Sequence, residues 1–398
     1  MNLFNKAIIL FITLTFLSNK IDSTPKTLIR VKRSGINNDA QKLNYPISWC
    51  VKLKDGKTYN EYMDVSKKLI REAISKIQYG TCVVFLEETN CPTDLTSPPN
   101  PLIIFIDDLK NRINQYNFTY SKNIPNPYEI KIEYNCNKRV GCFLKKILAY
   151  LGLILTHKRP DRDRYITINE SSILANSKAE FDKIENVDLH GTGYDYGSVM
   201  HISKFYRNYF FGDVFNIKQR EYELMTGQEY GPSFNDLKLL NYRYCDDQCP
   251  TKLNCQNGGY TTPFSCQYCE CPNGYKGVYC DELDVSKDEC GETNLFATTE
   301  VKKLIFKGQK KCNILIKAGN GKKIKIEVEE AKLPSFNPCF EKQGLEIKHR
   351  KDKSLTGLCF CTYAVNSTVT SEDNVVLIQY NGERVANEAK LSYQAINE

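Results

Sequence analysis

The sequence predicts a multidomain protein of the α+β class, in which a domain of mixed helices and strands precedes a small disulfide-rich module and an all-β sandwich. Residues 60–77 repeat apolar side chains every four positions, as one face of an amphipathic helix does, and short apolar runs lie on either side. Six cysteines crowd into residues 249–280, which is the density of a disulfide framework. After residue 290 the chain alternates apolar and polar residues in many short runs, a pattern that is typical of a sandwich.

The N-terminal residues predict secretion. An apolar run over 7–17 is followed by a polar exit at 18–23, which is too short for a membrane span and indicates a cleaved signal peptide over 1–23. A retained anchor is the alternative. Residues 30–33, Arg-Val-Lys-Arg, form a dibasic processing site, so that 24–33 is the expected propeptide. No other stretch is apolar enough to span a bilayer, and we expect a secreted, extracellular protein without a membrane span.

Composition places the chain among ordinary globular proteins. Its 398 residues allow two or three domains, and 41% hydrophobic with 25% charged residues argues against wholesale disorder. The net charge of +7 is modest and is densest over 302–353, where 15 Lys and Arg face 6 Asp and Glu. A solvated sheet face is the favoured interpretation, and an anionic partner such as a sulfated glycan is the alternative. No nucleic acid is expected as a partner.

The elements of the first domain follow in order along the chain. Residues 45–53 form the expected first strand and contain Trp49, the single tryptophan. The apolar face of the helix over 60–77 consists of Val65, Leu69, Ala73 and Ile77. Buried strands are expected over 82–86 and 102–106, a second helix over 142–151, irregular chain over 176–232, and a closing helix over 234–244 with Ser233 as its N-cap.

Residues 142–163 carry the clearest motif. They read Cys-Phe-Leu-Lys-Lys-Ile-Leu-Ala-Tyr-Leu-Gly-Leu-Ile-Leu-Thr-His-Lys-Arg-Pro-Asp-Arg-Asp, and this stretch resembles the zinc-site segment of the astacin metalloproteases, HExxHxxGxxHExxRxDRD. The positions that shape the scaffold are matched by Gly152, Arg159, Asp161, Arg162 and Asp163. The three zinc-ligand positions hold Lys145, Ala149 and Leu155, and the general-base position holds Lys146.

A second motif resembles the Met-turn of the same family, YxSxMHY. Met200 and His201 match it, whereas Ile202 stands where active members have the tyrosine that reaches the zinc. Thr156 replaces the glutamate that follows the third ligand. The resemblance implies a mixed sheet that carries two long helices, above a lower half that is mostly irregular, and it implies that Arg159–Asp163 are internal fixtures of the scaffold.

The active motif works because two histidines four residues apart share one helix face. This chain has no such pair, and its four histidines are His157, His190, His201 and His349. We therefore expect no cofactor, although that of the family is zinc. A shifted site of His190 with carboxylates is the alternative. Lys145 and Lys146 would repel a dication, and we expect them to point to solvent or pair with acids. In a sharper alternative, an ammonium replaces part of the charge of zinc or binds a peptide carboxylate.

The cysteines extend the resemblance to three modules. The end of the first domain resembles that of astacins, which implies Cys82–Cys245. The following six cysteines resemble an EGF-like module, and residues 290–398 resemble a CUB domain. These two resemblances imply the disulfides Cys249–Cys266, Cys255–Cys269, Cys271–Cys280, Cys290–Cys312 and Cys339–Cys359, with Cys361 as the competing partner of Cys339. Pairing among Cys50, Cys91, Cys136 and Cys142 stays open; Cys91 is a candidate partner of Cys136, which would leave Cys50 with Cys142. An odd count of 17 leaves one thiol, which permits a covalent dimer.

Three sequons fit an extracellular glycoprotein and lie at Asn117, Asn169 and Asn366. The expected boundaries are 34–245 for the degenerate astacin-like domain, 246–282 for the EGF-like module and 290–398 for the CUB-like domain. We expect a secreted metalloendopeptidase homologue that is inactive and binds an extracellular protein, a peptide or an anionic glycan. The alternatives are an active zinc metalloendopeptidase with a non-standard site, and a disulfide-linked structural component of a matrix.

Overall fold

The computed structural model describes residues 34–37, 42–53, 61–96, 98–112, 124–208, 212–286 and 288–397. The expected signal peptide, propeptide and sequon Asn117 lie outside the described residues. All described residues belong to one compact unit, 32–398. Within them, no helix combines the length and the hydropathy that a crossing of the membrane requires.

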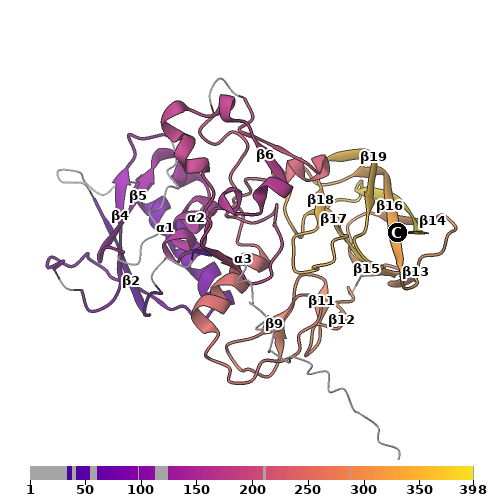
Figure 1. Ribbon diagram of the computed structural model, residues 1–398, viewed down its shortest axis with the longest axis horizontal. Coiled ribbons are helices and arrows are strands. Elements are labelled where there is room, and N and C mark those ends of the chain that lie inside the picture. Colours follow the sequence, from indigo (N-terminus) through magenta and orange to yellow (C-terminus); the bar gives the residue numbers. More distant parts are fainter. Residues whose placement is uncertain are drawn as a thin grey trace, which may run out of the picture. The chain divides into compact units, whose positions relative to one another are not determined.

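The first domain is built on a four-stranded sheet (Figure 1). The strand order is β3-β2-β4-β5, and the strands are β2 (Ile47–Lys52), β3 (Phe85–Glu87), β4 (Leu102–Asp108) and β5 (Tyr128–Glu133). Every neighbouring pair in this sheet is parallel. The resemblance implied a mixed sheet, but within the described residues no antiparallel strand pairs with this sheet.

Two long helices accompany the sheet, α1 (Glu61–Gly80) and α2 (Val140–Tyr150). Phe105 of β4 joins the two layers, because its ring packs edge-on against Trp49 at 6.0 Å and against Phe143 of α2 at 6.4 Å between centroids. The predicted apolar face of α1 is rotated. Val65 is 41% exposed, whereas the buried stripe consists of Met63, Ser66, Ile70, Ala73, Ile74 and Ile77. A stripe with steps of three and four residues follows the 3.6-residue turn, which steps of four alone do not.

The lower half of the first domain contains short elements, as the resemblance implied. The two-stranded sheets pair β1 (Ser34–Asn37) with β7 (Val187–Leu189) and β6 (Ile166–Ile168) with β8 (Phe215–Ile217). The 3₁₀ turns are η1 (Tyr134–Lys138), η2 (Thr156–Lys158), η3 (Arg162–Arg164), η4 (Glu170–Ser172), η5 (Ala175–Phe181) and η6 (Arg220–Leu224).

The closing helix is shorter than predicted. Its α-helical part, α3 (Phe234–Leu240), continues as a π-helical turn, η7 (Asn241–Cys245). Ser233 is the N-cap, and it forms a capping box in which Asp236 N donates to Ser233 Oγ at 3.3 Å and Ser233 N donates to Asp236 Oδ2 at 2.8 Å.

A small module of two hairpins follows. The hairpins pair β9 (Tyr260–Thr261) with β10 (Cys269–Glu270) and β11 (Tyr275–Lys276) with β12 (Glu282–Leu283). Three disulfides hold these short strands, since a chain of this length buries too little apolar surface to fold on packing alone.

The C-terminal part is a sandwich of two sheets (Figure 1). One sheet has the order β13-β15-β20-β17-β18, with β13 (Asn294–Phe296), β15 (Lys311–Lys317), β20 (Val375–Asn381), β17 (Gly344–Lys348) and β18 (Leu358–Phe360). The other has the order β14-β21-β16-β19, with β14 (Lys302–Lys307), β21 (Glu388–Asn397), β16 (Lys322–Lys332) and β19 (Tyr363–Thr370). Phe306 of β14 stacks on Tyr380 of β20 at 5.0 Å between centroids, which joins the sheets. The predicted multidomain α+β class is confirmed.

The basic segment 302–353 includes many paired lysines. Lys303 pairs with Glu329, Lys332 with Glu330 at 3.1 Å, and Lys307 with Glu388 at 3.4 Å. Opposite charges therefore alternate on the sheet β14-β21-β16-β19. This supports a solvated sheet face, and not an anionic partner, as the explanation of the positive charge of the segment.

The structure forms eight disulfides and leaves one free thiol. The bonds are Cys50–Cys91, Cys82–Cys245, Cys136–Cys142, Cys249–Cys266, Cys255–Cys269, Cys271–Cys280, Cys290–Cys312 and Cys339–Cys361. The candidate pairing of Cys91 with Cys136 is wrong, and so is that of Cys50 with Cys142. Glu88 N donates to Trp49 O at 2.9 Å, which keeps the chain after β3 beside Cys50.

The expected bond Cys339–Cys359 is also wrong. Cys359 lies within β18, opposite Glu346 of β17, whereas the chain after it runs beside residues 333–334 and brings Cys361 to Cys339. The free thiol of Cys359 is 1% exposed. A buried thiol cannot reach a second chain, so the folded protein does not support a covalent dimer or a disulfide-linked matrix through the odd cysteine.

Candidate functional site

The helix α2 and the turn after it set the geometry of the site. Every residue of α2 is buried, and positions 145 and 149 are one turn apart on the same face. Gly152 ends the helix with φ 98°, a backbone conformation that favours glycine. The chain then returns so that Thr156 N donates to Met200 O at 3.0 Å. This bond places Leu155 beside the Met-turn, as the astacin pattern requires of its third ligand position.

The positions brought together here lack ligand atoms. Ala149, Leu155 and Ile202 are all buried, and they belong with Met200 to the same hydrophobic core. Alanine, leucine and isoleucine carry no side-chain donor for a metal. Catalytic zinc needs three protein ligands, so the residues present at this site do not fit zinc.

Lys145 fills the first ligand position and is buried. Its side chain is 2% exposed, and Nζ donates to Gln228 O at 3.3 Å and lies 3.8 Å from Glu229 Oε1. Burial lowers the pKa of Lys145, and the charge of Glu229 opposes that shift. The ammonium is thus held by the segment 228–229 rather than by solvent.

Lys146 fills the general-base position and faces another element. Its Nζ lies 3.1 Å from Oε1 and 3.0 Å from Oε2 of Glu133, at the end of β5. Burial lowers the pKa of Lys146, and Glu133 opposes the shift. Of the two outcomes expected for the lysines, pairing with acids is the one that the structure shows, and exposure to solvent is wrong for both.

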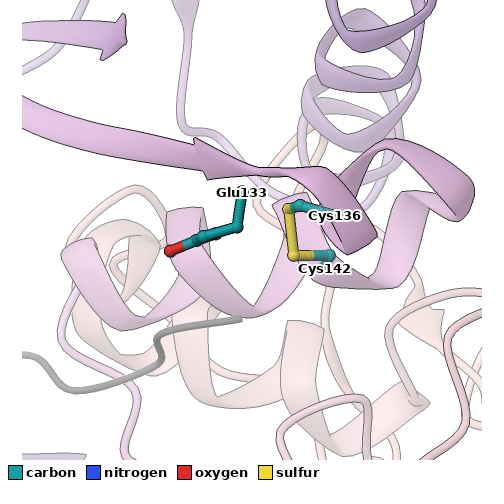
Figure 2. Close-up of side chains that lie close together, drawn as sticks. All are labelled: Glu133, Cys136 and Cys142. Carbon is teal, nitrogen blue, oxygen red and sulfur yellow. A yellow bond between two sulfur atoms is a disulfide. The ribbon is translucent and has the colours of Figure 1, made fainter. Parts of the chain in front are cut away.

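One cluster of potential metal ligands occurs among the described residues: Glu133, Cys136 and Cys142 (Figure 2). The two sulfur atoms form a disulfide, as Figure 2 shows, and the carboxylate pairs with Lys146. A disulfide sulfur is not a thiolate ligand, so this cluster is a structural bond beside an ion pair.

The histidines lie apart from the ligand positions. His201 is fully buried between Tyr194 OH, 2.9 Å from Nε2, and Ile202 O, 2.9 Å from Nδ1, and burial lowers its pKa to about 4. His157 Nε2 lies 3.1 Å from Glu180 O. His190 is exposed with Asp188 Oδ2 at 3.7 Å, and in the described part of the chain no third ligand joins them. The alternative of a shifted site at His190 is not supported.

His349 joins the sandwich to the first domain. Its Nε2 lies 2.8 Å from Tyr222 OH, and its Nδ1 lies 3.1 Å from Thr370 O. Burial lowers the pKa of His349 to about 4. The neighbouring Arg350 donates from Nη1 to Tyr194 O at 2.7 Å, so the loop that carries both residues packs against the chain leading into the Met-turn.

The scaffold positions form an internal network. Arg159 binds Asp161 through two hydrogen bonds of 2.9 Å, and it also donates to Thr192 O and Gly193 O at 3.1 Å. Arg162 donates to His157 O at 2.8 Å, and Asp163 accepts from Lys183 at 3.1 Å. These residues therefore hold the turn after α2.

Asp236 fixes the Met-turn from the first turn of α3. It accepts from Ser198 Oγ at 2.6 Å and from Val199 N at 3.0 Å, and burial raises its pKa to about 6. Sequence reasoning missed this role, although Ser233 followed by an acid three residues later is a capping-box signal. It also missed Glu133, Gln228 and Glu229, for which no local pattern gives a signal.

A cleft of ≈ 380 Å³ opens at the first ligand position. Among the described residues, the lining comes from the chain just after β4, from η1, from α2, from the chain after η4, from the chain after the Met-turn and from the turn at 227–229. It consists of Arg112, Asn135, Lys145, Leu174, Ile202, Ser203, Phe205, Tyr206, Arg207, Asn208, Gly227 and Glu229. Lys145 and Ile202 are the two positions of the degenerate site that reach it.

Comparison with known proteins supports the resemblance. Residues 57–245 match the peptidase family described as Astacin. Zinc metalloproteinase nas-34 of Caenorhabditis elegans is 29% identical over 357 residues, which cover 89% of this chain and 56% of that protein. Zinc metalloproteinase nas-30 of the same species is 30% identical over 83% of this chain and 43% of that protein, and dpy-31 of Brugia malayi is 33% identical over 61% and 43%. The chain thus spans about half the length of these relatives.

Among solved structures, high choriolytic enzyme 1, a hatching enzyme zinc-protease from Oryzias latipes, aligns with a TM-score of 0.38 at 19% identity, over 49% of this chain and 87% of that chain. The CUB1-EGF-CUB2 domain of human MASP-1/3 aligns with a TM-score of 0.22 at 18% identity, over 37% of this chain and 54% of that chain.

Proposed function

Residues 57–245 of this chain belong to the astacin family of peptidases, and from that premise we propose a secreted metalloendopeptidase homologue that is catalytically inactive and acts by binding. In this proposal 1–23 is a signal peptide and 24–33 a propeptide. The degenerate peptidase domain covers 34–245, the EGF-like module 246–282 and the CUB-like domain 290–398. The eight disulfides fit an oxidising, extracellular location.

One observation carries the proposal. The three ligand positions converge beside the Met-turn, yet they present an ammonium and two aliphatic side chains. The ammonium of Lys145 is tied to Gln228 and Glu229, so it does not leave the position to a metal. A positive charge at this point also opposes a dication by Coulomb repulsion. Zinc would therefore find neither ligands nor a favourable field.

The loss of metal chemistry removes the source of the attacking water in this class of hydrolysis. A zinc peptidase lowers the pKa of a bound water and polarises the substrate carbonyl through the metal. At the general-base position, Lys146 is bound to Glu133 and lies away from the cleft lining. Among the described residues of this site, none supplies a replacement at either step, and the cleft is left with a binding role.

The experiment measures bound zinc and proteolysis in the secreted, purified protein. We expect well below one equivalent of zinc by mass spectrometry, and no cleavage of casein that a chelator abolishes. A relative described as a zinc metalloproteinase, such as dpy-31 of Brugia malayi, prepared in the same way, is the positive control. Near-stoichiometric zinc together with chelator-sensitive cleavage by the unmodified chain would refute the proposal.

A further inference from the structure

The cleft at the first ligand position is rich in cationic groups. Arg112, Lys145 and Arg207 line it, and among the described residues of the lining the one acid is Glu229, which lies 3.8 Å from Lys145 Nζ. Glu180 reduces this excess from outside the lining, since its Oε1 lies 3.2 Å from Arg207 Nε. The lining still retains more positive than negative charge after that pair is counted. An anionic group is thus the occupant that the charges of this cleft favour.

The cations stand at different depths. Lys145 is 2% exposed and lies at the inner end, whereas Arg112 is exposed at the rim. Two hydrogen bonds from η1 hold the backbone at Arg112: Asn135 Nδ2 donates to Arg112 O, and Tyr134 N donates to Asn111 O at 2.9 Å. Its guanidinium lies 5.5 Å from the ring centre of Tyr134. An anion that reaches Lys145 therefore passes a second, well-placed cation.

The backbone of Arg207 is in an unfavourable conformation that its neighbours maintain. It has φ 55°, which is rare for residues other than glycine, and Leu174 N donates to its carbonyl at 3.0 Å. A residue other than glycine keeps such a conformation only where the surrounding structure determines it. Here it is the third cation of the cleft lining.

The remaining walls of the cleft are partly apolar. Leu174, Ile202, Phe205 and Tyr206 contribute to them, and Phe205 is 54% exposed. An apolar side chain next to an anionic group would fit these walls. The C-terminal end of a peptide combines the two features, since its carboxylate is directly attached to the carbon that carries the last side chain.

Resting on the proposed binding role, we propose that the cleft captures the C-terminal carboxylate of a peptide, with Lys145 at its inner end and an apolar last residue against Ile202 and Phe205. Lys145 keeps its contacts with Gln228 O and Glu229, and the carboxylate adds a second anionic group beside an ammonium that burial has deprived of water. In this arrangement the ammonium occupies the ligand position of a catalytic metal and serves for recognition.

The test uses the full secreted chain and fluorescein-labelled hexapeptides of one sequence that ends in leucine. One peptide has a free C-terminal carboxylate and the other a C-terminal amide, and binding is followed by fluorescence anisotropy up to millimolar protein. We expect the acid to bind roughly 10- to 100-fold more tightly than the amide, since charge-assisted hydrogen bonds are lost with the carboxylate. Equal affinities, or no binding of the acid, would overturn the inference.

Substitutions in the cleft test which residues cause the preference for the peptide with a free carboxylate. Lys145→Met should abolish the preference for the acid, and Arg112→Gln, at an exposed position, should reduce it even if the first variant fails to fold. Lys204→Met is the matched control, because Lys204 is a neighbouring lysine that pairs with Asp213 and Glu223 and does not line this cleft. A preference that persists in both cleft variants contradicts the proposal. So does a peptide amide ending in glutamate that binds as tightly as the acid, because the site would then recognise side chains.

The outcome is separate from that of the zinc experiment. A protein that holds no zinc and shows no preference for the acid would refute this inference alone and leave the inactive homologue standing.

Discussion

Lys146→Met should destabilise the first domain strongly, although the change replaces a charged residue at a buried helix position with an apolar one. In the unmodified protein, Lys146 Nζ lies 3.0 and 3.1 Å from the two carboxylate oxygens of Glu133, and the side chains are 3% and 0% exposed. Methionine leaves Glu133 as a buried charge without this partner. Breaking a buried pair on one side costs about 3–5 kcal/mol of unfolding free energy.

That cost is large relative to the total unfolding free energy of a domain. Domains of this kind have unfolding free energies of about 5–15 kcal/mol. Because a domain of about 200 residues shifts its melting temperature by roughly 2–4 °C per kcal/mol, the variant should melt about 6–20 °C lower.

Trp49 provides the assay. It is the only tryptophan, it is 2% exposed in β2, and its fluorescence reports denaturant unfolding of this domain with the disulfides intact. The double variant Lys146→Met with Glu133→Gln should recover most of the loss, because it removes both charges. Lys67→Met is the control: Lys67 lies 3.0 Å from Glu87, but the side chains are 21% and 29% exposed, so it should cost at most about 1 kcal/mol. A single variant that loses less than the control, or a double variant no better than the single, would refute the reasoning.

Three further predictions concern other parts of the molecule. Cys359 should resist alkylation by iodoacetamide in the folded protein and react fully after unfolding without reductant, as counted by intact mass, because burial raises its pKa and blocks access; labelling of the native protein would contradict this. His349→Gln should flatten the pH dependence of the unfolding free energy. The pKa of His349 is about 4 in the folded protein and near 6.5 in the unfolded chain. The stability that the neutral ring contributes is therefore present above pH 6.5 and is lost as the pH falls toward 4, by about 3 kcal/mol at most. Parallel denaturation curves of both proteins across that range measure it, and equal slopes would argue against it. Asn366 is exposed, whereas Asn169 Nδ2 donates to Asp213 O at 3.1 Å, so a secreting host should glycosylate Asn366 more fully than Asn169. Glycopeptide mapping measures the occupancy of both sites, with Asn366→Gln as the control. Higher occupancy at Asn169 would contradict the argument.

Much of the fold is visible in local patterns. The helix at 61–80 was predictable because its apolar side chains repeat along one face, and the strands β2, β4, β15 and β20 because each is a short segment rich in apolar residues that faces a core. The astacin resemblance is confirmed by the match over 57–245. The strands β19 and β21 were missed. In β19 the exposed positions outnumber the buried ones, so the chain offers little apolar alternation there.

The partners of the lysines could not be read from the sequence. Glu229 lies far from α2 along the chain, in the loop before α3. Glu133 lies nearer, at the end of β5, but no regular spacing relates it to Lys146, and only the path of the chain through η1 brings the two side chains together. The choice between Cys359 and Cys361 failed for a similar reason, since the two residues are neighbours on one strand end and only the path of the chain beyond β18 decides which meets Cys339. Spacing identifies a motif, but which distant group satisfies a buried charge depends on tertiary packing.

Because aliphatic side chains fill the ligand positions, the folding of this domain does not depend on a supply of metal. A protein that folds around zinc inherits the pH dependence of its ligands and a sensitivity to chelators, because binding energy is part of its folding energy. Here Ala149, Leu155 and Ile202 close the same space through contacts within the core. The packing around the Met-turn thus needs no metal, and we expect the same structure in surroundings poor in zinc as in those rich in it.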